Sequence, residues 1–201
     1  MQRVHNKAYN RIKGTGRGSV FITGDFLDLA SYDTVKKILL RLCDDGKLQR
    51  LSPGIYYFPK KSKLLGDLSP RIDKIAAAIS RKNKIRVLVS ESLAANLLGL
   101  TTQVPSKNIF LTDGKTKKIA IGKQTIFFKH AAPKIMRLSK RKGSMVVQAL
   151  KYFGKDRINS KLINALKKTI PNSIKKDLVK CKPFVSEWMR PKLDELAGEK
   201  A

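Results

Sequence analysis

The clearest pattern of hydrophobic and polar positions lies in residues 20–58, where helical spacing gives way to extended spacing. After Ser31 or Asp33, either of which can cap a helix start, apolar residues recur at intervals of three and four. This spacing predicts a helix that ends at Gly46 and buries one stripe, formed by Val35, Ile38, Leu39 and Leu42. A shorter helix, which Thr23 can cap, precedes it and carries Phe26, Leu27 and Leu29.

The residues after Gly46 have the pattern of a short hairpin. Residues 48–51 and 55–58 are two predicted strands, joined by Ser52-Pro53-Gly54. Proline sets φ at the first corner of a type II turn, and glycine accepts the positive φ at the second. Helix, turn, basic helix and hairpin follow one another as in a winged helix-turn-helix, whose second helix enters the major groove of DNA. The open face of that helix would carry Thr34, Lys36, Lys37 and Arg41.

A polar stretch bounded by Pro59 and Pro70 predicts a division of the chain into two domains. The first domain, residues 1–62, holds the predicted winged helix-turn-helix. The second, residues 63–201, is expected to be another α+β domain. The fold class of the whole chain is therefore predicted to be α+β.

The second domain is expected to contain a small antiparallel β-meander followed by C-terminal helices. The pattern after Pro70 predicts a helix, then a short strand and an alanine-rich helix. Three β-rich runs come next, at residues 108–112, 117–121 and 125–129. Asp113-Gly114 is a hairpin signal between the first two runs, and Gly122-Lys123 supplies the next turn. Helical periodicity returns at Ser144.

The charge balance points to a polyanionic partner. The chain has 43 Lys and Arg residues against 15 Asp and Glu, a formal net charge of +28. This is far from the near-neutral balance of most enzymes that act on small neutral substrates, and it fits DNA, RNA or an acidic protein surface. Residues 63–201 hold 31 of the basic residues. The second domain therefore has the larger excess, although dispersed lysines also serve solubility.

Residue types that carry catalysis or bind metals are sparse. The only histidines, His5 and His130, lie in different predicted segments, and nothing marks a nucleophile with an oriented base. Cys43 and Cys181 lack CxxC spacing, which suggests neither zinc nor a disulfide framework. Glu91 fits a helix start, and no carboxylates cluster as in a metal-dependent nuclease. We therefore expect a protein that is not an enzyme and that uses no metal or other cofactor.

No apolar run approaches the length needed to span a bilayer, and the N-terminal residues have no apolar stretch between their charges. With two cysteines in apolar contexts, the sequence predicts a reduced cytoplasmic protein without membrane contact.

Four segments are distinctive: GKLQRLSPGIYYFP at residues 46–59, SESLAANLLGLTTQVP at 90–105, NIFLTDGKTKKIAIG at 108–122 and IFFKHAAPK at 126–134. Together they resemble the AbiEi-like antitoxins of bacterial type IV toxin-antitoxin systems. The resemblance covers roughly residues 3–160, and its most specific parts are AANLLGL, LTDG and GIYY. Core packing and backbone turns would also explain the small residues in these segments.

The resemblance implies an N-terminal winged helix that binds double-stranded operator DNA and represses its own operon. It also implies a C-terminal domain that counteracts a nucleotidyltransferase-like toxin. By the same resemblance, DNA-binding roles fall to eight residues at recognition-helix and wing positions: Ser31, Tyr32, Thr34, Lys36, Lys37, Arg41, Arg50 and Ser52. Two alternatives are open. One is a nucleic-acid-directed enzyme or RNA-binding protein that uses the winged domain for substrate delivery, and the other is an adaptor that uses that domain against protein.

Overall fold

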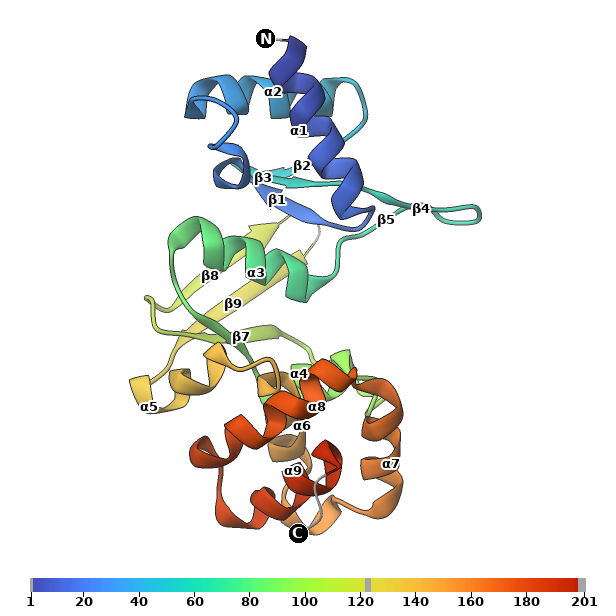
Figure 1. Cartoon of the computed structure of the whole chain (residues 1–201), viewed down its shortest axis with the longest axis vertical. Coiled ribbons are helices and arrows are strands. Elements are labelled where there is room, and N and C mark those ends of the chain that lie inside the picture. Colours follow the sequence, from blue (N-terminus) through green and yellow to red (C-terminus); the bar gives the residue numbers. More distant parts are fainter. Residues whose placement is uncertain (1, 122–123, 199–201) are drawn as a thin grey trace. The chain divides into compact units, whose positions relative to one another are not determined.

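The structure is a computed structural model that describes residues 2–121 and 124–198 (Figure 1). It divides into two compact units. The N-terminal unit comprises Met1–Lys84 and Ala120–Gln124, and the C-terminal unit comprises Ile85–Ile119 and Thr125–Ala201. Both units combine helices with small sheets, which confirms the predicted α+β class.

The N-terminal unit contains α1 (Gln2–Thr15), β1 (Val20–Ile22), the 3-10 turn η1 (Thr23–Phe26), α2 (Tyr32–Asp44), β2 (Gln49–Ser52), β3 (Ile55–Tyr57), β4 (Lys60–Ser62), β5 (Gly66–Leu68) and α3 (Ile72–Asn83). Strands β1, β3 and β2 form an antiparallel sheet with β3 in the middle. Strands β4 and β5 form a separate two-stranded hairpin that projects from the rest of the unit (Figure 1).

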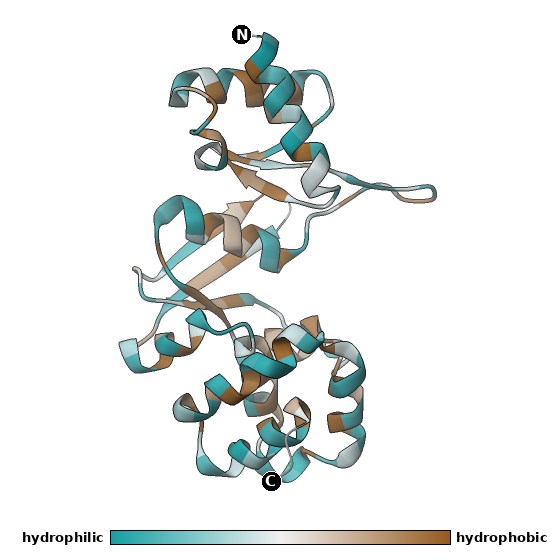
Figure 2. Cartoon of the chain, viewed as in Figure 1, coloured by the Kyte–Doolittle hydropathy of each residue, from teal (hydrophilic) through white to brown (hydrophobic). Residues whose placement is uncertain are grey.

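Helix α2 forms as the hydrophobic spacing predicts. Ser31 is its cap, because Oγ of Ser31 accepts the backbone N–H of Thr34 at 3.5 Å. All four residues of the predicted stripe are buried, in one cluster with Ile12 of α1 and Phe26 of η1. Hydrophobic and hydrophilic residues alternate along α1 and α2 in Figure 2, as expected for helices with one face on a core.

The first of the two predicted helices is only the short turn η1, and the prediction that Thr23 caps it is wrong. The Asp25 carboxylate accepts the backbone N–H of Ile22 at 2.9 Å, so an acid inside the turn satisfies the amide that precedes it. The Thr23 side chain is buried instead.

Helix α3 is bound to β1 and η1 by a buttressing ion pair. Nε and Nη2 of Arg81 contact the Asp25 carboxylate at 3.2 and 3.0 Å, and Nη2 also donates to the Val20 carbonyl at 3.1 Å. Two lysines of α3 donate to backbone carbonyls as well: Lys74 to Gly18 at 3.0 Å and Lys82 to Pro53 at 2.5 Å. These contacts place α3 in the N-terminal unit.

The unit therefore extends to Lys84, beyond the boundary that the sequence suggested between residues 62 and 63. The polar stretch between Pro59 and Pro70 contains the β4–β5 hairpin, so it is structured and is not a linker. Polarity and prolines mark a surface hairpin as readily as they mark a domain boundary.

We expect Asp25→Asn to lower the free energy of unfolding of the N-terminal unit by about 1–2 kcal/mol, because it removes the ionised acceptor of Arg81 in a partly exposed site. Chemical denaturation, monitored by hydrogen exchange of the backbone amides of α2 and α3, would measure this loss of stability. The matched control is Asp28→Asn, which breaks the more exposed Arg11–Asp28 pair and should cost less. A larger loss in Asp28→Asn than in Asp25→Asn would contradict this account.

The C-terminal unit begins with β6 (Val87–Val89), α4 (Glu91–Leu97), β7 (Asn108–Thr112), β8 (Lys117–Ile121) and β9 (Gln124–His130). Helices and turns follow: α5 (Pro133–Met136), η2 (Arg137–Lys140), α6 (Ser144–Phe153), η3 (Lys155–Arg157), α7 (Ser160–Thr169), α8 (Asn172–Leu178), η4 (Val179–Phe184), η5 (Glu187–Met189) and α9 (Arg190–Ala197). The adjoining ends of β8 and β9 belong to the N-terminal unit by contact.

The four-stranded sheet is mixed, in the order β6-β7-β9-β8, instead of the predicted antiparallel meander. Strand β7 pairs antiparallel with β6 and parallel with β9. The hairpin predicted at Asp113-Gly114 is wrong, because β9 lies between the two strands that the hairpin would join. Gly114 lacks the positive φ of a type I′ turn, and the Asp113 carboxylate accepts N–H and Nε of Arg86 at 2.8 and 2.7 Å. The predicted turn at residues 122–123 lies outside the described residues.

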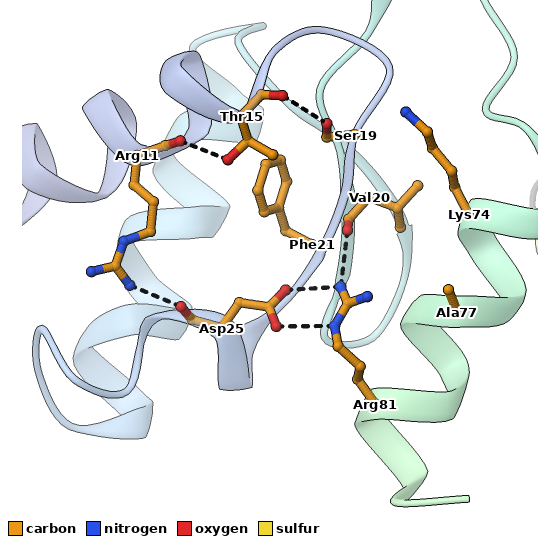
Figure 3. A pocket seen from close by; sticks show the side chains of 9 residues that line it. All are labelled: Arg11, Thr15, Ser19, Val20, Phe21, Asp25, Lys74, Ala77 and Arg81. Carbon is orange, nitrogen blue, oxygen red and sulfur yellow. Dashed lines mark hydrogen bonds and ion pairs between the residues drawn. The ribbon is translucent and has the colours of Figure 1, made fainter. Parts of the chain in front are cut away.

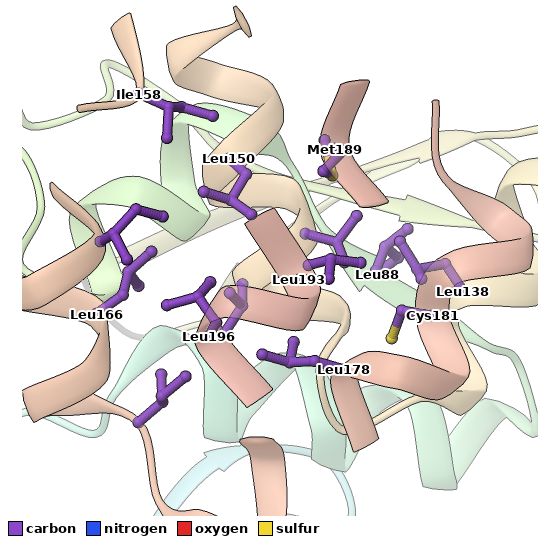
Figure 4. Close-up of a cluster of buried hydrophobic side chains, with 14 of the residues drawn as sticks. Leu88, Leu138, Leu150, Ile158, Leu166, Leu178, Cys181, Met189, Leu193 and Leu196 are labelled. Atoms are coloured by element: carbon purple, nitrogen blue, oxygen red, sulfur yellow. The ribbon is translucent and has the colours of Figure 1, made fainter. Parts of the chain in front are cut away.

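The C-terminal helices enclose a second core, in agreement with the helical periodicity after Ser144 (Figure 4). Its members include Leu88 of β6, Leu150 of α6, Leu166 of α7, Leu178 of α8, Cys181 of η4, and Leu193 and Leu196 of α9. Gly143 allows a close approach here, since a Cβ at this position would lie 2.8 Å from Cδ2 of Leu178 and 3.1 Å from Sγ of Cys181. Trp188 packs against the same core.

Both cysteines are free, and burial raises the pKa of each thiol, that of Cys181 to about 11. Because the thiolate is the reactive form, we expect Cys181 to resist iodoacetamide near pH 8 until the unit unfolds. Cys43 is only partly buried and should react sooner. Peptide mass spectrometry with and without denaturant would measure both, and equal labelling of Cys181 in the two conditions would contradict its burial.

Candidate nucleic-acid interface

The exposed side of α2 carries most of the residues predicted to contact DNA. Since the apolar stripe faces the core, the side chains of Lys36, Lys37 and Arg41 are exposed. Tyr32, the first residue of the helix, is 54% exposed. Thr34 is half-buried. Three cations and one aromatic side chain are thus accessible to a ligand.

Ser31 and Thr34 form the start of α2. Oγ of Ser31 donates to Oγ1 of Thr34 at 3.0 Å, in addition to capping the helix. Arg50 and Ser52 lie on β2, where Arg50 is exposed and Ser52 is half-buried beside a β-bulge. Six of the predicted residues therefore lie on α2 or at its cap, and the other two lie on the neighbouring strand.

Acidic residues flank the cations of α2. Asp33 lies in its first turn and Asp44 at its end, and both are exposed. Asp45 follows and pairs with Lys47 at 2.9 Å, a hydrogen bond that lowers the pKa of Asp45. The excess positive charge on α2 itself is therefore modest, and a polyanion would need cations from neighbouring elements.

The β4–β5 hairpin supplies such cations, although the pattern of hydrophobic and polar residues did not predict this hairpin. Lys60, Lys61 and Lys63 are all exposed. The signal that could have revealed the hairpin is Gly66-Asp67 after the short polar run, because glycine with positive φ, here 66°, commonly ends a β-turn.

A pocket of about 420 Å³ lies between α1, β1 and α3 of the N-terminal unit (Figure 3). Arg11, Lys74 and Arg81 line it, but each already binds a group of this unit. Arg11 donates to the Asp25 carbonyl at 3.0 Å and pairs with Asp28 at 2.6 Å. The cations therefore hold the unit together, and we assign the pocket no ligand.

A second pocket, of about 330 Å³, lies on the C-terminal unit beside the start of α4. Its lining contains Ser90, Glu91 and Ser92 together with Lys129 and Tyr152. Oγ of Ser90 is buried and has no hydrogen-bond partner among the described residues. A serine nucleophile needs an adjacent base, so the observed arrangement is not that of a catalytic relay.

The histidines and the potential metal ligands of the described residues do not form a further candidate site. His130 is exposed, with Nδ1 3.0 Å from the Gly114 carbonyl, and His5 is buried in α1. Within residues 2–121 and 124–198, no group of three His, Cys, Asp or Glu side chains could hold a metal ion. Over the same ranges, no helix has both the length and the apolar composition to cross a bilayer.

Comparison with known proteins assigns a family. The model of DUF6088, described as a family of unknown function, matches residues 7–178, from α1 to the end of α8. No curated protein matches the chain. Since the match spans most of the chain and includes α2 and the β4–β5 hairpin, the chain belongs to the DUF6088 family.

Proposed function

We propose that this protein is a cytoplasmic, sequence-specific regulator that binds double-stranded DNA through a winged helix-turn-helix and represses its own operon. The order of elements supports this assignment. A helix, a strand, a short helical turn, a second helix and two strands follow one another, and the first strand pairs with the third. Winged helix-turn-helix domains have this order, with the second helix of the motif as the recognition helix.

The observation that carries the proposal is the exposed face of α2. Lys36, Lys37 and Arg41 are exposed opposite a fully buried stripe, so the helix can enter a groove without exposing its core side. Tyr32 lies at the start of α2, and the start of a recognition helix is the part that contacts base edges.

Footprinting of the full chain on the DNA upstream of its own gene would test the proposal. Titrations should compare that DNA with random duplex of equal length at about 0.15 M salt, since a net charge of +28 gives some affinity for any polyanion. Protection of a discrete upstream segment, with repression of a reporter, is the expected result. Equal affinity for both duplexes would reject sequence-specific binding.

We propose in addition that the protein is an antitoxin that counteracts a nucleotidyltransferase-like toxin. The support is the sequence resemblance in the segments at 90–105, 108–122 and 126–134, which lie in or next to the C-terminal unit. Co-expression with a toxin of this class encoded beside the gene should restore growth. Failure of the full chain to do so would leave a DNA-binding regulator without antitoxin activity.

One observation favours an RNA-binding alternative. The Phe127 ring is only partly buried, and ammonium groups of Lys107 and Lys118 each lie 5.6 Å from its centre. Aromatic rings among lysines on a sheet can stack single-stranded bases. Stronger binding to single-stranded RNA than to upstream duplex, lost in Phe127→Ala, would favour this alternative over the DNA-binding proposal.

A further inference from the structure

The end of the β4–β5 hairpin presents two leucines to solvent. Leu64 is 95% exposed and Leu65 is 77% exposed. Figure 2 shows this hydrophobic end on a hairpin that is otherwise largely hydrophilic. Apolar side chains displayed together at the end of a projecting element are a common mark of an interaction site.

The hairpin is held by specific hydrogen bonds at its base and at its end. At the base, Oη of buried Tyr57 donates to the Leu68 carbonyl at 2.8 Å and accepts the N–H of Lys60 at 3.3 Å. At the end, Oγ of Ser62 accepts the N–H groups of Leu64 and Leu65, each at 3.3 Å. The leucines are therefore presented by an ordered turn.

A further hydrogen bond joins the hairpin to the strand that follows α2. Nε2 of Gln49, on β2, donates to the Asp67 carboxylate at 3.0 Å. Gln49 is followed by Arg50, which is exposed on the same strand. The hairpin is thus fixed to the element that also carries a predicted wing residue.

The positive charge and the small apolar area of the hairpin indicate the kind of partner that it binds. Lys60 and Lys61 lie on β4 and Lys63 directly precedes the leucines, whereas the one acid of the hairpin, Asp67, already accepts from Gln49. Two leucines and a few lysines offer far less area than the roughly 1,200 Å² that a stable protein interface buries. A minor groove requires little area, because an apolar wedge enters between base steps while cations contact the phosphates on either side.

We propose that the β4–β5 hairpin binds the DNA minor groove and that Leu64 and Leu65 insert between base steps and bend the duplex. This inference rests on the proposed DNA-binding function and assigns one part of it to a second element. The lysines of the hairpin contact phosphates, and the leucines supply a sequence-tolerant wedge.

The test compares full-length wild type with Leu64→Ala/Leu65→Ala on a duplex of about 30 base pairs labelled at both ends for energy transfer. Wild type should bend this duplex, and the variant should lose the bend and bind about tenfold more weakly. The salt slope and the melting temperature should not change, because no charge and no buried contact is removed. Val104→Ala is the matched control, because Val104 is 81% exposed on the C-terminal unit.

A second variant, Lys61→Ala/Lys63→Ala, should lower the salt slope by ~1 per charge. If wild type binds DNA but the leucine variant binds and bends it equally well, the hairpin inference is overturned and the proposed function stands. If wild type binds no duplex at all, both fail. Leucine-dependent binding to anionic phospholipid vesicles, with DNA binding unaffected, would also overturn the inference and would assign the hairpin to a membrane surface.

Discussion

Leu39→Ala is expected to lower the free energy of unfolding of the N-terminal unit by about 2–5 kcal/mol. Leu39 is fully buried at the middle of α2, in one cluster with Ile12, Phe26 and Leu42. Its truncation removes apolar contacts and leaves a cavity that the surrounding helices fill only in part. Small domains have a total stability of about 5–15 kcal/mol, so the variant would be close to unfolding at elevated temperature.

The measurement must distinguish the two units. The only tryptophan, Trp188, belongs to the C-terminal unit, so its fluorescence reports on that unit. Hydrogen exchange of the α2 amides reports on the N-terminal unit, and we expect the loss of unfolding free energy only in that unit. Leu64→Ala removes the same atoms from a 95% exposed position and should leave stability unchanged. Equal stability of Leu39→Ala and wild type would mean that α2 is packed by a different face.

Lys37→Ala/Arg41→Ala is expected to weaken binding to upstream DNA by about 10- to 100-fold while the fold survives. Both side chains are exposed on α2 and lie outside its buried stripe. A contact with phosphate would also lower the salt slope by ~1 per charge, whereas a contact with a base edge would relax specificity at one position. Fluorescence titration at several salt concentrations separates these two kinds of contact.

The control for this variant is Lys168→Ala/Lys180→Ala, which changes the net charge equally at exposed positions of the C-terminal unit. It should have a smaller effect, because these lysines belong to no element proposed to contact DNA and contribute only general, salt-screened attraction. If both variants lose the same affinity, charge alone explains the binding, and α2 has no special role.

The sequence predicted α2 well because the information is local. Val35, Ile38, Leu39 and Leu42 define the buried face by spacing alone, and Ser31 is a preferred cap. Given that face, the exposure of Lys36, Lys37 and Arg41 follows directly.

The extent of the N-terminal unit depends on contacts between distant residues and was therefore not predictable from local pattern. Arg81 contacts Asp25, and Lys82 contacts the Pro53 carbonyl, but nothing near Arg81 or Lys82 in the sequence identifies these partners. A fragment that ends near residue 63 would lack all of α3 and these contacts. We therefore expect it to be less stable than a fragment that ends at Lys84.

The four-stranded sheet shows the same limit for strand pairing. Asp113-Gly114 between β-rich runs is a strong local signal for a hairpin, and the chain nevertheless turns there without pairing the two strands. The Asp113 carboxylate instead binds Arg86, which precedes β6. Likewise, the exposure of Leu64 and Leu65 follows from the tertiary position of the hairpin, since apolar residues in a polar stretch could equally have docked on a core.

The strand order β6-β7-β9-β8 also determines how this sheet can assemble during synthesis. Once residue 112 has left the ribosome, β7 can pair with β6, but the partner of its other edge, β9, is complete only at His130. Until then one row of backbone N–H and C=O groups on β7 is open, and open strand edges are sites of aggregation in nascent chains. Slow translation while residues 113–130 emerge from the ribosome would therefore lower the yield of native protein, whereas slow translation after His130 has emerged would leave this sheet complete.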